Sequence, residues 1–203
     1  MHWDRLFEDL EGQLAAEWET ERAVLSAESE RLRISRLDLR SRLRHLCEAR
    51  ASVTVELADG RRIPVTMRAL GADWVAAESA PGDDLLLGRS TRIMPLHAIH
   101  VIRADHGSVL ASLEDVAERG SALRERMSLG FVLRDLARRR VPVHLSLTVG
   151  DDVHGTIDRA GSDHLDLAVH DAGTARLAAA VQGFRIIPLT TLIALRTVGD
   201  QRL

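Results

Sequence analysis

Hydrophobic and polar residues alternate in two separate stretches of the chain, and each stretch predicts a β-strand. Residues 53–57 read Val-Thr-Val-Glu-Leu, and residues 143–147 read Val-His-Leu-Ser-Leu. This period-two alternation is typical of a strand with one buried face. Leucines at helical spacing precede each stretch, as at Leu39, Leu43 and Leu46, so a short amphipathic helix is expected before each strand.

The two stretches belong to an internal repeat. When residues 36–78 are set over residues 126–168, an offset of 90, twelve positions are identical without a gap. The similarity resumes after a slip of three residues, with RIMPLHAIHVIR (92–103) matching RIIPLTTLIALR (185–196). A repeat of this length indicates one structural unit that occurs twice.

Each copy predicts one helix followed by about five short antiparallel strands. Gly60 and Gly150 mark the first turn, and Gly71 and Gly161 mark the second. We therefore expect an α+β fold with two duplicated small antiparallel β-barrels, each preceded by a helix.

This order of elements resembles the Sm-like small barrel of the LSm proteins and Hfq-type RNA chaperones. The residues that carry the resemblance are LSLTVGDDVHGTIDRAGSDHLDL (145–167) and FRIIPLTTLIALR (184–196). The RNA pocket of that family has an Asp-x-x-Asn and an Arg-Gly pair, whereas this chain has no Asn and Arg185 is followed by Ile186. Other SH3-type small barrels, including PRC-type barrels, have the same pattern, and the choice between them stays open.

Two segments lie outside the repeats. Residues 1–34 predict one long amphipathic helix whose apolar stripe suits either packing on the barrels or docking to a partner; the stripe begins with Trp3, Phe7, Leu10, Leu14 and Trp18. Residues 105–125 predict a helical connector. The expected organisation is thus a helix (1–34), a first repeat (35–104), the connector (105–125) and a second repeat (126–203).

Composition indicates a globular protein of the bacterial cytoplasm. Apolar residues make up 45% and charged residues 28%, and the net charge is −3. We see no membrane-spanning apolar run and no signal-peptide pattern, so the cytoplasm is the expected compartment. Every one of the 27 basic residues is Arg, and Lys, Asn and Tyr are absent, which indicates a GC-rich bacterial gene. The lone Cys47 lies on an apolar helical stripe and is expected to be a buried thiol.

Basic residues suggest a surface that binds either acidic protein segments or nucleic acid. Arg36, Arg40 and Arg44 are spaced for one helix face, and three consecutive arginines end the equivalent helix: Arg138, Arg139 and Arg140. These side chains either grip phosphates, pair with the acidic N-terminal helix, or form a solvated face at the helix C-terminus. In the first-turn loops, Arg61 and Arg62 of one copy correspond to Asp151 and Asp152 of the other. Opposite charges at equivalent positions favour head-to-tail contact, within the chain or between chains.

Histidines on the second copy suggest one candidate metal site. With hairpin turns centred at residues 151 and 161, Asp158 is expected opposite both His144 and His164 on the outer face of the strands. Two imidazoles and a carboxylate can bind a divalent metal, although a hydrogen-bond ladder without ligand is the favoured interpretation. The same row in the first copy is Thr54, Arg68 and Trp74, which has no metal ligands.

The sequence contains no catalytic motif that we recognise, so we expect no enzyme, no cofactor and no small-molecule substrate. The favoured function is a non-enzymatic assembly or adaptor protein that binds a protein partner or itself. The alternative is an RNA-binding Sm-like regulator that uses the Arg-lined helices.

Overall fold

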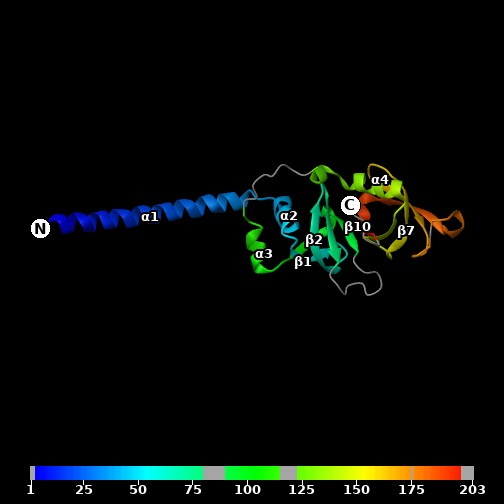
Figure 1. Ribbon diagram of the computed structural model, residues 1–203, viewed down its shortest axis with the longest axis horizontal. Coiled ribbons are helices and arrows are strands. Elements are labelled where there is room, and N and C mark those ends of the chain that lie inside the picture. Colours follow the sequence, from blue (N-terminus) through cyan, green and yellow to red (C-terminus); the bar gives the residue numbers. More distant parts are fainter. Residues whose placement is uncertain (1–2, 80–89, 115–122, 175, 198–203) are drawn as a thin grey trace. The chain divides into compact units, whose positions relative to one another are not determined.

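The computed structural model describes residues 3–79, 90–114, 123–174 and 176–197 (Figure 1). The chain divides into two compact units, Met1–Arg42 and Leu43–Leu203. The first unit consists mainly of α1 (Trp3–Ser35), and the long helix predicted for this segment is therefore confirmed. Leu14 and Trp18 on α1 are 54% and 59% exposed. The side chains of Trp3, Phe7 and Leu10 lie outside the described part of the chain.

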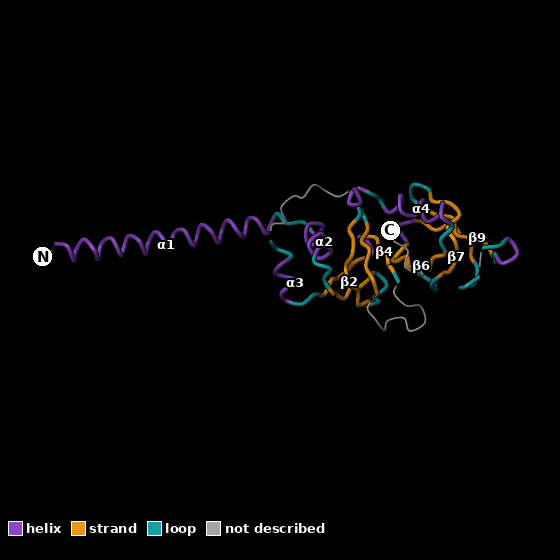
Figure 2. The backbone as a smooth tube through the Cα atoms, in the orientation of Figure 1, coloured by secondary structure: helices purple, strands orange, loops and turns teal. Residues whose placement is uncertain are grey.

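Both sequence copies contain one helix followed by five strands in the same order, and Figure 2 shows helix and strands in each. The first copy comprises α2 (Leu39–Glu48), β1 (Ser52–Leu57), β2 (Arg62–Leu70), β3 (Trp74–Ser79), β4 (Thr91–Pro95), the 3-10 turn η1 (Leu96–Ala98) and β5 (Ile99–Arg103). The second comprises α4 (Leu129–Arg139), β6 (Pro142–Leu147), β7 (Val153–Ala160), β8 (His164–Val169), the 3-10 turn η3 (Ala178–Ala180), β9 (Gly183–Pro188), the 3-10 turn η4 (Leu189–Thr191) and β10 (Leu192–Thr197). The connector contains α3 (His106–Ala111) and the 3-10 turn η2 (Leu123–Arg126), and residues 115–122 lie outside the described part.

Local backbone irregularities also repeat at the sequence offset. Arg50 and Arg140 follow their helices with φ of 49° and 55°, the left-handed conformation that ends many helices. Gly60 and Gly150 adopt φ of 81° and 92° in the first turn of each copy. Each copy has a β-bulge in its second strand, between Met67 and Ala69 in β2 and between Ile157 and Arg159 in β7. The repeat is therefore present in the backbone structure as well as in the amino-acid sequence.

The expected α+β fold is present, but the two duplicated barrels are not confirmed, because the described strands form a sheet that is not closed. The strands form one open ten-stranded sheet in the order β5-β1-β2-β3-β4-β10-β6-β7-β8-β9, and every described pair of neighbouring strands is antiparallel. The last strand of the second copy, β10, pairs with β4 of the first copy as well as with β6. Because β10 bonds to the other copy, the two repeats share one sheet.

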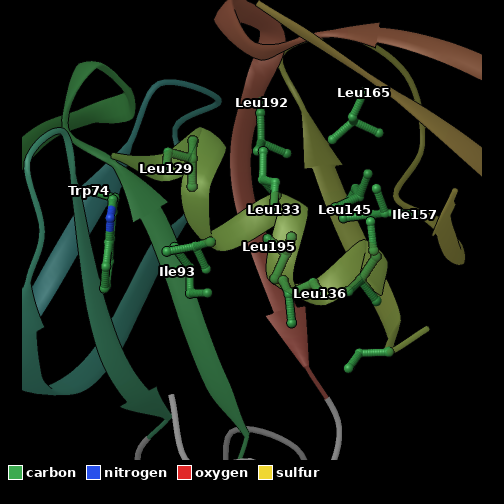
Figure 3. Close-up of a cluster of buried hydrophobic side chains, with 14 of the residues drawn as sticks. Trp74, Ile93, Leu129, Leu133, Leu136, Leu145, Ile157, Leu165, Leu192 and Leu195 are labelled. Atoms are coloured by element: carbon green, nitrogen blue, oxygen red, sulfur yellow. The ribbon is translucent and has the colours of Figure 1, made fainter. Parts of the chain in front are cut away.

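The hydrophobic core also crosses the boundary between the copies. Trp74 and Ile93 of the first copy belong to a buried cluster built mainly from the second copy (Figure 3). Ile193 and Ala194 of β10 belong in turn to the cluster formed by the first copy. Apolar burial is the main force stabilising a fold, so this exchange joins the repeats energetically.

The start of α2 separates residues that were expected on one helix face. Asp38 accepts a hydrogen bond from the Ser41 amide at 2.7 Å, and the helix begins at Leu39. Arg36 lies in the turn after α1, outside α2. The predicted stripe of Arg36, Arg40 and Arg44 on a single helix is therefore wrong, because a turn interrupts the helical spacing.

Candidate functional site

The two copies meet along β4 and β10, and we call this pairing the internal junction. Thr91, Arg92 and Ile93 lie opposite Thr197, Arg196 and Leu195 respectively. The facing apolar side chains, Ile93 and Leu195, are both fully buried. These strands come from the repeated RIMP and IALR segments, so the sequence similarity marks the strands that pair but does not reveal that they pair across the copies.

The start of α4 adds a second set of contacts to the internal junction. The indole nitrogen of Trp74 donates to the carbonyl oxygen of Met127 at 2.9 Å. Asp73 accepts a hydrogen bond from the Leu129 amide at 2.6 Å, which satisfies a backbone donor at the first turn of α4. Trp74 is only 1% exposed and packs in the core.

Trp74 lies on the face of β3 opposite Val75 and Ala77, which pack in the core of the first copy, so Trp74 is buried because the second copy covers that face. The expected row of Thr54, Arg68 and Trp74 is not formed, since Thr54 lies opposite Pro64 and β2 is bulged between Met67 and Ala69.

An ion pair joins the two first-turn loops, as their opposite charges suggested. The Arg61 guanidinium donates to both carboxylate oxygens of Asp152, at 3.0 and 3.1 Å. Desolvation is the largest single influence and opposes ionisation of Asp152, but the hydrogen bond and charge of Arg61, together with Ser146 and His144, lower the pKa of this carboxyl group. The predicted contact between oppositely charged loops thus occurs within the chain.

Charge reversal at this ion pair is expected to be mutually compensating. Arg61→Asp and Asp152→Arg should each lower the free energy of unfolding, by about 1 kcal/mol or less because both side chains are partly exposed. The double variant should recover most of that loss, since it restores opposite charges at the same distance. Urea unfolding of the four proteins measures the coupling. Strictly additive effects would show that the two charges do not interact in solution.

The predicted row of His144, Asp158 and His164 is not formed. The first hairpin of the second copy is centred near residue 149, so His144 lies opposite His154. Asp158 occupies the bulge of β7 and accepts hydrogen bonds from Arg176 and Arg140, which lower its pKa. His164 instead bonds to Asp163 at 2.8 Å. A shifted turn and a bulge therefore separate the three residues that the sequence pattern brought together.

His144 instead forms a row with two other histidines, His154 on β7 and His170 directly after β8. The ring centroids of His144 and His154 are 4.5 Å apart, and those of His154 and His170 are 5.0 Å apart. His170 is 2% exposed and its Nε2 lies 2.9 Å from the Thr156 hydroxyl. Desolvation and the neighbouring His154 lower the pKa of His144. Among the described residues, no group of three or more His, Cys, Asp and Glu side chains is arranged to hold a metal ion.

Most of the candidate basic residues are engaged with carboxylates. Arg44 pairs with Glu125 at 3.1 Å, and Arg138 and Arg139 both pair with Asp135. Arg62 pairs with Glu56 at 3.0 Å. The partners Glu125, Asp135 and Glu56 lie outside the N-terminal helix that was the expected acidic partner. RNA binding through these arginines stays a prediction, as does partner docking by α1.

Cys47 is buried in the core of the first copy. Burial raises the pKa of its thiol to about 12, so the group stays protonated and unreactive near neutral pH. This environment agrees with the expected structural thiol.

The two edge strands of the sheet are equivalent, in the sequence repeat, to the two strands that pair at the internal junction. Among the described strands, β5 and β9 form the two edges. By the repeat offset of 93, β9 is the counterpart of β4, and β5 is the counterpart of β10. On β9, Phe184 and Ile186 are 67% and 75% exposed. An edge strand with exposed apolar side chains favours pairing with another strand.

In the parts of the chain that are described, no helix combines the length and the hydropathy needed to cross a membrane. Comparison with protein-family models, with curated proteins and with solved structures finds no match to this chain. The resemblance to Sm-like or other SH3-type barrels accordingly stays a prediction.

Proposed function

We propose that this protein is a non-enzymatic assembly module whose molecules join head to tail, with β9 of one molecule pairing with β5 of the next molecule. The observation that carries the proposal is a difference between equivalent residues. Ile93 is fully buried where β4 meets β10, whereas its counterpart Ile186 on β9 is 75% exposed. A β5 strand placed against β9 would cover Ile186 as β10 covers Ile93.

The start of the repeat helices gives the same contrast. Leu129 at the start of α4 is 3% exposed, whereas its counterpart Leu39 at the start of α2 is 56% exposed. Asp73 binds the Leu129 amide, and its counterpart Asp163 has a side chain that is 85% exposed. The second repeat thus has an exposed acceptor, Asp163, equivalent to Asp73, and the first repeat has an exposed helix start, Leu39, equivalent to Leu129.

Charge complementarity supports the same arrangement. The ion pair of the internal junction joins Arg61 to Asp152. At the offset of 90, Asp151 of the second repeat is equivalent to Arg61, and Arg62 of the first repeat is equivalent to Asp152. The two charges exchange places, so they still attract each other. A junction between two molecules would therefore place Asp151 of one molecule beside Arg62 of the other.

The internal junction also specifies the register. β4 and β10 pair in one antiparallel register without a shift, in which Arg92 lies opposite Arg196 and Ile93 lies opposite Leu195. The offset of 93 gives the equivalent register for β9 against β5 of a second molecule. In this register Phe184 would face Ala104, Arg185 would face Arg103 and Ile186 would face Ile102 of the second molecule. Main-chain hydrogen bonds between such strand edges are the basis of β-augmentation.

Sedimentation velocity over a range of concentrations tests the proposal. We expect the protein to associate as its concentration rises, and Ile186→Arg to shift the distribution to monomer because a charge would be buried against β5. Leu123→Arg is the matched control, since Leu123 is 78% exposed and lies on the connector turn η2. A monomeric protein at all concentrations, or equal effects of the two substitutions, would contradict the proposal.

Cross-linking tests the register. In a Cys47→Ala background, Phe184→Cys with Ala104→Cys should yield disulfide-linked oligomers, because directly opposed positions bring the Cβ atoms within bonding range. The mismatched pair of Phe184→Cys with Val101→Cys should cross-link weakly. Equal yields from the two pairs would rule out the proposed register.

A further inference from the structure

One face of α1 carries a stripe of exposed apolar side chains. Leu14, Trp18, Leu25 and Leu32 follow one another at intervals of four or seven residues, which brings them to the same side of a helix. Each of these side chains is more than half exposed. Helices in proteins owe most of their stability to the packing of such a face, and a contiguous exposed apolar surface is typical of an interaction site.

The stripe is symmetric about the middle of the helix. Leu14 and Leu25 lie at nearly equal distances on either side of the midpoint of α1. In the sequence, Phe7 and Leu32 are placed in the same way, further from the midpoint. A twofold axis perpendicular to the helix would therefore exchange Leu14 with Leu25 and Phe7 with Leu32. A surface that is complementary to itself in this way fits a second copy of the same chain.

The charges of α1 favour the antiparallel orientation that this symmetry requires. Residues 3–19 contain six carboxylate side chains and one guanidinium group, whereas residues 20–35 contain three of each. Two arginines of the second half form ion pairs with glutamates of the same half, so this half is neutral overall. A parallel pair of helices would place two acidic halves side by side. An antiparallel pair places each acidic half beside a neutral one and avoids this repulsion.

We propose that α1 forms an antiparallel two-helix coiled coil with α1 of a second molecule, with Leu14 of one molecule packed against Leu25 of the other. The helix is 33 residues long, which is enough for four heptads. Glu21 and Glu28 follow Leu14 at intervals of seven residues and lie at the edge of the stripe. These two carboxylates make the association weaker than that of a seam of leucines alone, so it requires a high protein concentration.

This interface is separate from the edges of the sheet and does not rest on the pairing of β9 with β5. The two helices are related by a twofold axis, so the assembly closes at the dimer. Head-to-tail pairing of sheet edges does not close in this way. Where both interfaces form, α1 would connect one head-to-tail assembly to another.

Sedimentation of the full chain in an Ile186→Arg background tests the dimer of α1 independently of the sheet edges. We expect this protein to be monomeric when dilute and to form dimers, and no larger species, at the highest concentrations. Leu25→Glu should weaken dimerisation by about tenfold or more, because it places a charge in the apolar seam. Ala27→Glu is the matched control, since it adds the same charge on the opposite face of α1. Leu14→Glu should have the same effect as Leu25→Glu and replaces it if that variant does not fold.

The outcomes separate this inference from the proposed head-to-tail assembly. An Ile186→Arg protein that stays monomeric at the highest concentrations would overturn the α1 dimer without affecting the pairing of β9 with β5. Equal dimerisation of the Leu25→Glu and Ala27→Glu proteins would overturn it as well. If the sheet edges do not pair, Ile186→Arg changes nothing and the dimer of α1 is still observed.

Disulfide formation tests the orientation of the helices. Leu14→Cys and Leu25→Cys are introduced into separate proteins that also carry Cys47→Ala and Ile186→Arg. Oxidation of a mixture of the two proteins should yield a mixed dimer, because the two positions meet across an antiparallel seam. Each protein oxidised alone should cross-link weakly. Efficient self-linking of each protein without mixed dimers would show a parallel arrangement and overturn the proposal.

Discussion

Replacing Trp74 with alanine is expected to lower the free energy of unfolding by about 3–5 kcal/mol, the usual cost of removing a large buried aromatic side chain. Trp74 is 1% exposed and packs among residues of the second copy, although it lies on β3 of the first. The substitution would also remove the hydrogen bond from its indole nitrogen to Met127. We expect the loss to affect both copies, because their cores are shared. Urea unfolding followed by far-UV circular dichroism measures it.

Two variants make this prediction specific. Trp18→Ala is the same chemical change on α1, where the side chain is 59% exposed, and it should alter the stability of the sheet little. Trp74→Phe keeps most of the packing but loses the hydrogen bond, so an intermediate cost is expected. If Trp74→Ala unfolded one copy and left the other folded, the shared core would not couple the two repeats.

The second large effect is expected for Gly71→Ala. A Cβ atom at Gly71 would meet the Trp74 indole at 2.1 Å, far inside contact distance. Since Trp74 is buried and hydrogen-bonded, its ring has little room to move. Overpacking of this kind typically costs about 1–3 kcal/mol, and a rigid neighbour favours the upper part of that range. Thermal or urea denaturation measures the change.

The second copy provides the matched control for this substitution. Gly161 is the counterpart of Gly71, and a Cβ atom there would meet the His164 ring at 2.7 Å. The His164 side chain is 48% exposed and can rotate away at the cost of about one unfavourable rotamer. Gly161→Ala should therefore destabilise the protein less than Gly71→Ala. Equal costs would show that the burial of Trp74 does not determine the effect.

Periodic local patterns predicted most of the secondary structure. The alternation at residues 53–57 and 143–147 gives β1 and β6, and the leucine spacing gives α2 and α4. The repeat offset predicted equivalent elements in the two copies. Side-chain alternation and helical spacing depend on neighbouring residues, so they can be recognised in a single sequence.

The candidate sites were harder to predict because they depend on strand register. A turn centred near residue 149 placed His144 opposite His154, and the bulge in β7 turned Asp158 toward Arg140 and Arg176. A shift of one residue reverses which face a side chain occupies. The histidine row of His144, His154 and His170 was missed for the same reason. The opposite charges of the first-turn loops, by contrast, indicated a contact that the structure contains.

The sequence by itself determined that the protein consists of a long helix and two copies of a helix-and-strand unit, because local spacing and the repeat depend on residues close together in the chain. The tertiary structure alone decided that β10 pairs with β4 and that the copies share one open sheet. Backbone hydrogen bonds between strands use the same N–H and C=O groups in every strand, so they leave no signature in residue types. Which edges remain open, and therefore where the proposed assembly would occur, follows from that long-range pairing.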